Sequence, residues 1–256
     1  LSLALRGAGQ MELRSLRWRP LPGAREEAES VQTQLKDSIY GPVQVFYGGD
    51  AAEEVFKTVV SPRIIHLATH GFYLPHETAG AFNESRSVKR SSGSALGRLR
   101  YVNNPLLRSG LVLAGANQLA TNSEERTVDL EDGWLTAQEI SSMNFRNTEL
   151  VVLSACESGL GDSELGHGVR GLQRAFLVAG AHSLLMSMFE VPDKETRELM
   201  GLFYQHFVQT GDQVKSLQFA QQKLILQRRT QSGSAHPFFW ASFFIVGQPK
   251  ATPVGK

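Results

Sequence analysis

The sequence predicts an α/β domain built on a central mixed, mostly parallel sheet with helices on both faces. Short apolar runs alternate along the chain with amphipathic helical patterns, the order expected of such a sheet. The run Glu149–Ala155 is almost continuously apolar, as in a strand covered on both faces. The 256 residues are 41% hydrophobic and 20% charged, ordinary values for a globular domain. No internal repeat stands out, so we expect one domain over residues 1–256.

The first half of the chain predicts strands and two helices. The strands are expected at Glu12–Trp18, Val43–Tyr47, Arg63–Ala68 and Gly110–Ala114. Ala24–Lys36 has the apolar stripe of an amphipathic helix. Asp50 can cap a second helix that reaches about Val59.

The second half continues the alternation. Thr136 followed by Glu139 is a capping-box pattern that opens a short helix. One helical face is formed by Val169, Leu172, Phe176 and Ala179, with Gly180 as its end. Helices are also expected at Glu195–Phe207 and Gln213–Leu226, and strands at Glu149–Ala155, His182–Phe189 and Phe238–Val246. The last strand follows two helices and is expected to lie antiparallel at an edge.

Residues 77–104 interrupt this pattern. They are polar and rich in Ser, Gly and Arg, and an insertion of that length is usually a functional lid or a disordered loop. We expect a mobile insertion, and a solvated loop, a substrate lid and a cleavage site all remain open. Residues 121–132 predict a second loop.

Charge and cysteine content narrow the function classes. A net charge of +1 provides no field for nucleic acid, and no apolar run is long enough to cross a bilayer, so neither partner is expected. The single cysteine excludes an internal disulfide and Cys-rich zinc sites, and it fits a reducing, cytoplasmic compartment. Because the chain begins with Leu, we expect a processed chain or a fragment.

Two residues have the chemistry of a cysteine peptidase. Cys156 follows the strongest strand and His70 follows the run Arg63–Ala68, so parallel strands can bring both to one edge of the sheet. A nearby imidazolium favours the nucleophilic thiolate and can protonate a departing amine. Backbone N–H groups at Gly71 and Cys156 can approach a developing oxyanion. A buried, inert thiol is the alternative.

These motifs resemble the CHAT domain family, which is related to caspases and separases and often fused to tetratricopeptide repeats. The resemblance is carried by His66-Leu-Ala-Thr-His70-Gly71, Leu153-Ser-Ala-Cys-Glu-Ser-Gly159, Leu21–Ala28, Asp132–Ile140, Gly168–Phe176 and His236–Gly247. It implies a caspase-like fold with His70 and Cys156 as the catalytic dyad. One departure is His167, where the family often carries an acidic residue between the glycines.

The resemblance also implies limited, regulated cleavage of protein substrates, often in bacterial defence or signalling, with no metal, nucleotide or other cofactor. A regulatory repeat domain in the parent chain or a partner complex would control it. The alternative from another class is a non-catalytic interaction module that keeps the fold. A thiol probe whose labelling of Cys156 requires His70 would favour the enzyme.

Acidic residues near the same edge suggest a pocket for a basic substrate residue. Glu190 and Asp193 follow the strand His182–Phe189, in a segment that resembles the separase segment that receives the substrate arginine. Asp162 and Glu164, in the turn after Cys156, are further candidates. Capping of the next helix by Asp193 is the simpler explanation for that residue.

Two other patterns are weaker. His66 and His70 have the i, i+4 spacing of a helical zinc motif, but they are expected on a strand, so His66 should pack or form hydrogen bonds beneath the dyad. Gly166–Gly171 matches G-x-G-x-x-G but does not follow directly from a strand, so close helix packing is the better explanation.

Overall fold

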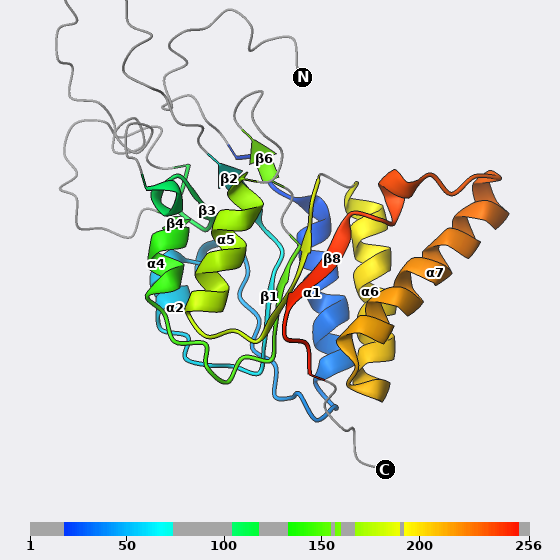
Figure 1. Ribbon diagram of the computed structural model, residues 1–256, viewed down its shortest axis with the longest axis horizontal. Coiled ribbons are helices and arrows are strands. Elements are labelled where there is room, and N and C mark those ends of the chain that lie inside the picture. The colour runs from blue at the N-terminus through cyan, green and yellow to red at the C-terminus, as the bar shows by residue number, and fades with distance from the viewer. Residues whose placement is uncertain are drawn as a thin grey trace, which may run out of the picture.

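The computed structural model describes residues 18–73, 104–117, 133–154, 157–159, 167–189 and 192–250. Within them, eight strands form two four-stranded sheets flanked by helices (Figure 1). The predicted strand Glu12–Trp18, apart from Trp18, and the insertion 77–104, apart from Asn104, lie outside the described residues, as does the second loop. The α/β class, with a mixed sheet and helices on both faces, is confirmed.

The larger sheet has the order β1-β5-β7-β8. Its strands are β1 (Ile64–Leu67), β5 (Leu150–Leu153), β7 (Ser183–Ser187) and β8 (Phe243–Gly247). The first three run parallel and β8 is antiparallel to β7, which confirms the predicted antiparallel edge. The aromatic run before β8 forms a 3-10 turn, η5 (Pro237–Phe239), so this strand begins later than the sequence predicts.

Strand β5 explains why the sheet needs helices on both faces. All four of its side chains are buried. Val151 and Leu153 join one apolar core, whereas Leu150 and Val152 join the other, as the two-residue period of a strand requires. A strand buried on both sides therefore appears in the sequence as a continuous apolar run rather than an alternating one.

Helices cover the two faces in separate groups (Figure 1). One group contains α1 (Pro22–Leu35), α6 (Asp193–Thr210) and α7 (Gln213–Ser232), and the other contains α2 (Glu53–Lys57), α4 (Ala137–Ser141) and α5 (His167–Val178). No helix in the described ranges is both long and apolar enough to cross a membrane.

The smaller sheet has the order β4-β3-β2-β6. Its strands are β4 (Trp134–Thr136), β3 (Ser109–Val112), β2 (His70–Tyr73) and β6 (Glu157–Gly159). The β2–β6 pair is parallel and the other two pairs are antiparallel. Only β3 corresponds to a strand that the sequence predicted, the one at Gly110–Ala114.

Of three local predictions, for two helix starts and one strand, the structure confirms one. The capping box at Thr136 is confirmed, since its hydroxyl accepts from the Glu139 N–H and the Glu139 carboxylate accepts from the Thr136 N–H. Asp50 as a helix cap is wrong: it ends the 3-10 turn η2 (Gly48–Asp50), and Ala52 is the N-cap of α2. The strand at Val43–Tyr47 is also wrong, because these residues lie in no strand.

Candidate functional site

The candidate site begins where the chain passes from the larger sheet to the smaller one. Strand β1 ends at Leu67 and β2 begins at His70, so His70 opens a strand of the second sheet. His70 follows the apolar run Arg63–Ala68 as the sequence indicated, but it also begins a strand that the sequence did not predict. Thr69 lies between β1 and β2. Its hydroxyl donates a hydrogen bond to the Val112 carbonyl of β3, which holds the crossing segment against the smaller sheet.

A second segment follows the same path beside the first. In the larger sheet His66 pairs with Val152, and in the smaller sheet Gly71 pairs with Glu157, so partners in both ladders are 86 positions apart. Between the ladders, the Ser154 N–H donates to the Leu67 carbonyl at 2.9 Å. Cys156 itself lies outside the described residues, between Ser154 and Glu157.

His70 is held by a main-chain carbonyl. Its Nε2 atom lies 2.7 Å from the carbonyl oxygen of Arg19. A carbonyl oxygen only accepts hydrogen bonds, so Nε2 carries the proton and donates it. In the neutral ring, Nδ1 is then the basic nitrogen. The ring is partly exposed and lies 5.2 Å, centroid to centroid, from the indole of Trp18.

Gly71 follows His70 in β2 and is buried. It pairs with Leu111 on one side and with Glu157 on the other, so its backbone lies inside the smaller sheet. Whether its N–H reaches a reacting carbonyl stays a prediction.

Of the acidic candidates for a substrate pocket, only Asp193 is described. It is exposed and forms the first residue of α6. Pro192 is the N-cap and has no side-chain capping bond, so the interpretation of Asp193 as the cap is wrong. A carboxylate in the first turn still interacts favourably with the helix dipole. Glu190, Asp162 and Glu164 lie outside the described residues, and the pocket stays a prediction.

His66, four residues before His70, is enclosed in the core. Its Nε2 lies 2.9 Å from Oε1 of Glu27 in α1, and its Nδ1 lies 3.0 Å from the hydroxyl of Tyr204 in α6. The histidine and glutamate side chains are only 9% and 6% exposed. The predicted hydrogen bonding of His66 is confirmed, whereas its place beneath the dyad stays a prediction. In the described ranges, no three His, Cys, Asp or Glu side chains gather closely enough to hold a metal ion.

The partners of His66 were not predicted from the sequence, although α1 contained a signal for one of them. The buried positions of this helix are Gly23, Glu27, Val31 and Leu35, spaced four residues apart. Glu27 therefore interrupts an otherwise nonpolar stripe. A carboxylate at such a position requires a buried partner, because burial of an unpaired charge is costly.

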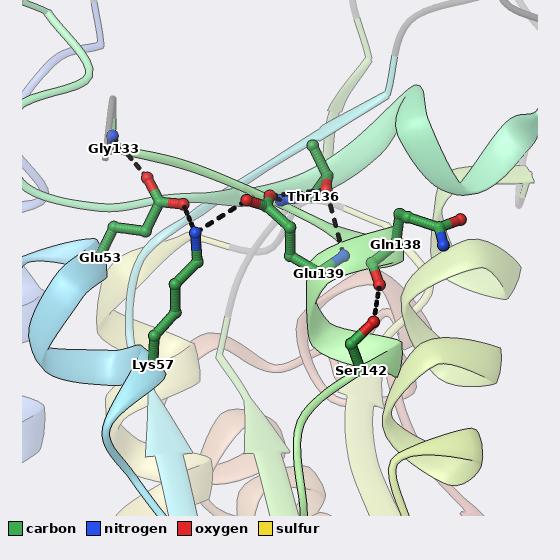
Figure 2. A network of polar contacts seen from close by, with 7 residues as sticks. All are labelled: Glu53, Lys57, Gly133, Thr136, Gln138, Glu139 and Ser142. Carbon is green, nitrogen blue, oxygen red and sulfur yellow. Dashed lines mark hydrogen bonds and ion pairs between the residues drawn. The ribbon is translucent and has the colours of Figure 1, made fainter. Parts of the chain in front are cut away.

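A second, partly buried polar network joins α2 to β4 and α4 (Figure 2). The Lys57 ammonium lies 2.8 Å from a carboxylate oxygen of both Glu53 and Glu139. Glu53 also accepts a hydrogen bond from the Gly133 N–H at 2.8 Å. Burial, with the charge of Glu139, raises the pKa of Glu53 to about 7. Burial also acts to raise the pKa of Glu139, but hydrogen bonds from Lys57 and Thr136 outweigh it and lower that pKa.

The mixed sheet and the helices on both of its faces define an α/β domain of the caspase-like class. The family model of the CHAT domain matches residues 4–248. The chain therefore belongs to the CHAT domain family, as its motifs indicated.

Two curated relatives carry the same region. The chain is 24% identical over 231 residues to tetratricopeptide repeat protein 28 of Mus musculus, and 26% identical over 231 residues to the Homo sapiens protein of that name. Each alignment covers 90% of this chain but only 9% and 8%, respectively, of the relatives. The chain thus corresponds to a small part of long proteins that are named for their repeats.

Proposed function

We propose that the chain is a cysteine endopeptidase that performs limited cleavage of protein substrates through His70 and Cys156. The observation that carries the proposal is the register of the two crossing segments. His70 and Cys156 are 86 positions apart, the same separation as the strand partners on both sides of the crossing. The register therefore supports a pairing of the imidazole with the thiol.

The hydrogen bond to Arg19 supports a division of labour between the ring nitrogens. With Nε2–H held by the carbonyl, Nδ1 exchanges protons with the reacting groups. The Cys156 thiolate attacks the scissile carbonyl carbon, and the His70 imidazolium protonates the departing amine. Water, deprotonated by His70, then hydrolyses the thioester and releases the thiol. Backbone N–H groups of Gly71 and Cys156 are proposed to stabilise the oxyanion.

Thiol labelling tests this proposal directly, because Cys156 is the only cysteine of the chain. We expect an electrophilic peptide probe to label the folded chain rapidly, and His70→Ala to slow labelling at least about tenfold. Denatured His70→Ala serves as the control for an accessible thiol. Equal labelling rates for the folded wild type and His70→Ala would refute the dyad and favour a non-catalytic interaction module.

Cleavage provides the second test. Cys156→Ala should remain folded by circular dichroism and lose peptide hydrolysis. An alanine variant that folds and still cleaves at the parental rate would end the proposal.

We further propose a preference for Arg or Lys on the acyl side of the cut bond, with the candidate carboxylates Glu190, Asp193, Asp162 and Glu164. Fluorogenic peptides with Arg, Lys, Asp, Leu or Met at that position decide the point. Faster turnover of the acidic or apolar peptides would contradict it. If Arg is preferred, separate Glu190→Gln and Asp193→Asn variants identify the carboxylate responsible.

We also propose a regulatory partner and a cellular compartment for this peptidase. Because the matched relatives are named for tetratricopeptide repeats, a repeat domain in the parent chain or a partner complex is proposed to regulate cleavage. The single cysteine fits a reducing compartment, and we propose a cytoplasmic location. We propose no cofactor. This regulation is testable by comparing the rate of peptide cleavage by the 256-residue chain alone with the rate after the repeat region is added as a separate protein.

A further inference from the structure

The main-chain carbonyl that holds His70 belongs to a segment that is itself fixed by one side chain. Asn117, which follows β3, accepts a hydrogen bond from the Trp18 N–H at its Oδ1, at 2.8 Å. Its Nδ2 donates to the Trp18 carbonyl at 3.0 Å. One carboxamide therefore forms hydrogen bonds with both the N–H and the carbonyl of Trp18, as the backbone of a neighbouring strand would.

The indole of Trp18 is held as well. Its ring meets the buried Trp134 of β4 edge-on at 5.5 Å, and Trp134 in turn meets Phe72 of β2 edge-on at 4.8 Å. The other neighbour of the Trp18 ring is His70 itself, at 5.2 Å. Aromatic pairs at these separations add stabilisation beyond area burial. The Trp18 ring thus lies against His70 of β2 and Trp134 of β4 in the smaller sheet.

We infer that Asn117 and Trp18 are positioning residues for His70: they fix the Arg19 carbonyl that selects the Nε2–H tautomer of the imidazole. Arg19 directly follows Trp18, so its carbonyl moves when the hydrogen bonds between Asn117 and Trp18 are lost. Arg19 is exposed, and water competes for its carbonyl whenever the segment moves away. The role in catalysis rests on the proposed function, but the tautomer does not.

The test is therefore spectroscopic. Two-bond 1H–15N correlation spectra of the 256-residue chain, labelled with 15N in histidine, report which ring nitrogen carries the proton. The His70 signals are assigned by their loss in His70→Gln. In the wild type above pH 8 we expect the Nε2–H tautomer to dominate. In Asn117→Ala the population of the Nδ1–H tautomer should increase severalfold.

Matched variants separate positioning from general loosening. Asn117→Asp keeps the acceptor for the Trp18 N–H but puts a carboxylate oxygen beside the Trp18 carbonyl, so it should shift the tautomer as well. Asn147→Ala, at an exposed asparagine outside the site, should leave it unchanged. A wild-type ring that is mainly Nδ1–H would overturn the inference even if no variant folds. An unchanged tautomer in a folded Asn117→Ala would also overturn it.

Activity is measured in parallel. Asn117→Ala should lower kcat at least about tenfold with KM nearly unchanged, because a displaced base affects the chemical step more than substrate binding. If Asn117→Ala loses the tautomer preference but the wild type cleaves no peptide, the positioning of the His70 ring stands and the peptidase proposal is refuted. Normal cleavage by an Asn117→Ala whose tautomer has shifted would overturn the positioning role in catalysis and leave the dyad standing.

Discussion

His66 and His70 are four residues apart, yet their surroundings differ in every respect that matters for chemistry. His66 lies in the larger sheet, with one ring nitrogen against Glu27 and the other against Tyr204. His70 opens a strand of the smaller sheet, is partly exposed, and has Nε2 on a main-chain carbonyl. The crossing between the sheets separates a histidine whose two nitrogens both contact core side chains from one that, among the described residues, is held at Nε2 and is proposed to exchange protons at Nδ1.

The difference shows that residue type and spacing alone do not identify a catalytic histidine. A general base needs a fixed ring and a basic nitrogen open to the reacting groups. Of these two histidines, His70 is the one held at Nε2 by a main-chain carbonyl, which supports the proposal that it is the general base. His66 instead resembles a structural residue, because its removal would leave a buried carboxylate without its partner.

The largest expected effect is the loss of activity on replacing His70. His70→Ala should lower kcat/KM for peptide cleavage at least about a hundredfold, because general acid–base catalysis contributes on that order. Its midpoint of thermal unfolding should stay close to that of the wild type, since the ring is partly exposed. A greater loss of activity in an equally stable His66→Ala would reverse the comparison.

His66→Ala should act on stability. It leaves the buried Glu27 carboxylate without its partner, so we expect the free energy of unfolding to fall by about 3 kcal/mol, measured by urea titration. The control is the double variant with Glu27→Ala, which removes the stranded carboxylate. If the two losses simply add in the double variant, the hydrogen bond between His66 and Glu27 contributes nothing and the interpretation of His66 is wrong.

The sequence predicted the parts of this comparison that depend on local pattern. The apolar runs at β5 and β7 and the capping box at Thr136 are local signals, and all three were confirmed. The strand expected at Val43–Tyr47 failed because β propensity forms a strand only when a neighbouring strand pairs with it.

Contacts that join distant segments could not be predicted. Glu27 and Tyr204 reach His66 from two helices, and Arg19 and Asn117 reach the His70 region from segments outside β2. Each depends on tertiary packing rather than on spacing along the chain. Only the charge of Glu27 in the nonpolar stripe of α1 was visible in advance.

Glu53 is a second buried glutamate, and burial changes its protonation even though Lys57 pairs with it. The pKa of Glu53 is raised from 4.5 to about 7. The folded state then binds more protons than the unfolded state between these pH values, so the free energy of unfolding should fall as pH rises from about 4.5 to about 7. Glu53→Gln should flatten this decline, measured by urea titration at several pH values.

The control for that titration is Glu54→Gln, one residue further along α2, where the side chain is exposed. It should retain the pH dependence of the wild type. A decline that is equally steep in Glu53→Gln would show that other groups cause it.

The smallest expected effect concerns the second partner of His66. Tyr204 is completely buried, and burial together with the charge of Glu27 holds its pKa well above 10.0, so its hydroxyl stays protonated and can donate to Nδ1 of His66. Tyr204→Phe removes this neutral hydrogen bond but leaves no charge unpaired. We expect a loss of about 1 kcal/mol in the free energy of unfolding, clearly less than for His66→Ala. Tyr47→Phe, outside the cluster, is the control and should change stability little. A loss for Tyr204→Phe as large as that for His66→Ala would mean that the hydroxyl, rather than the carboxylate, accounts for the structural role of His66.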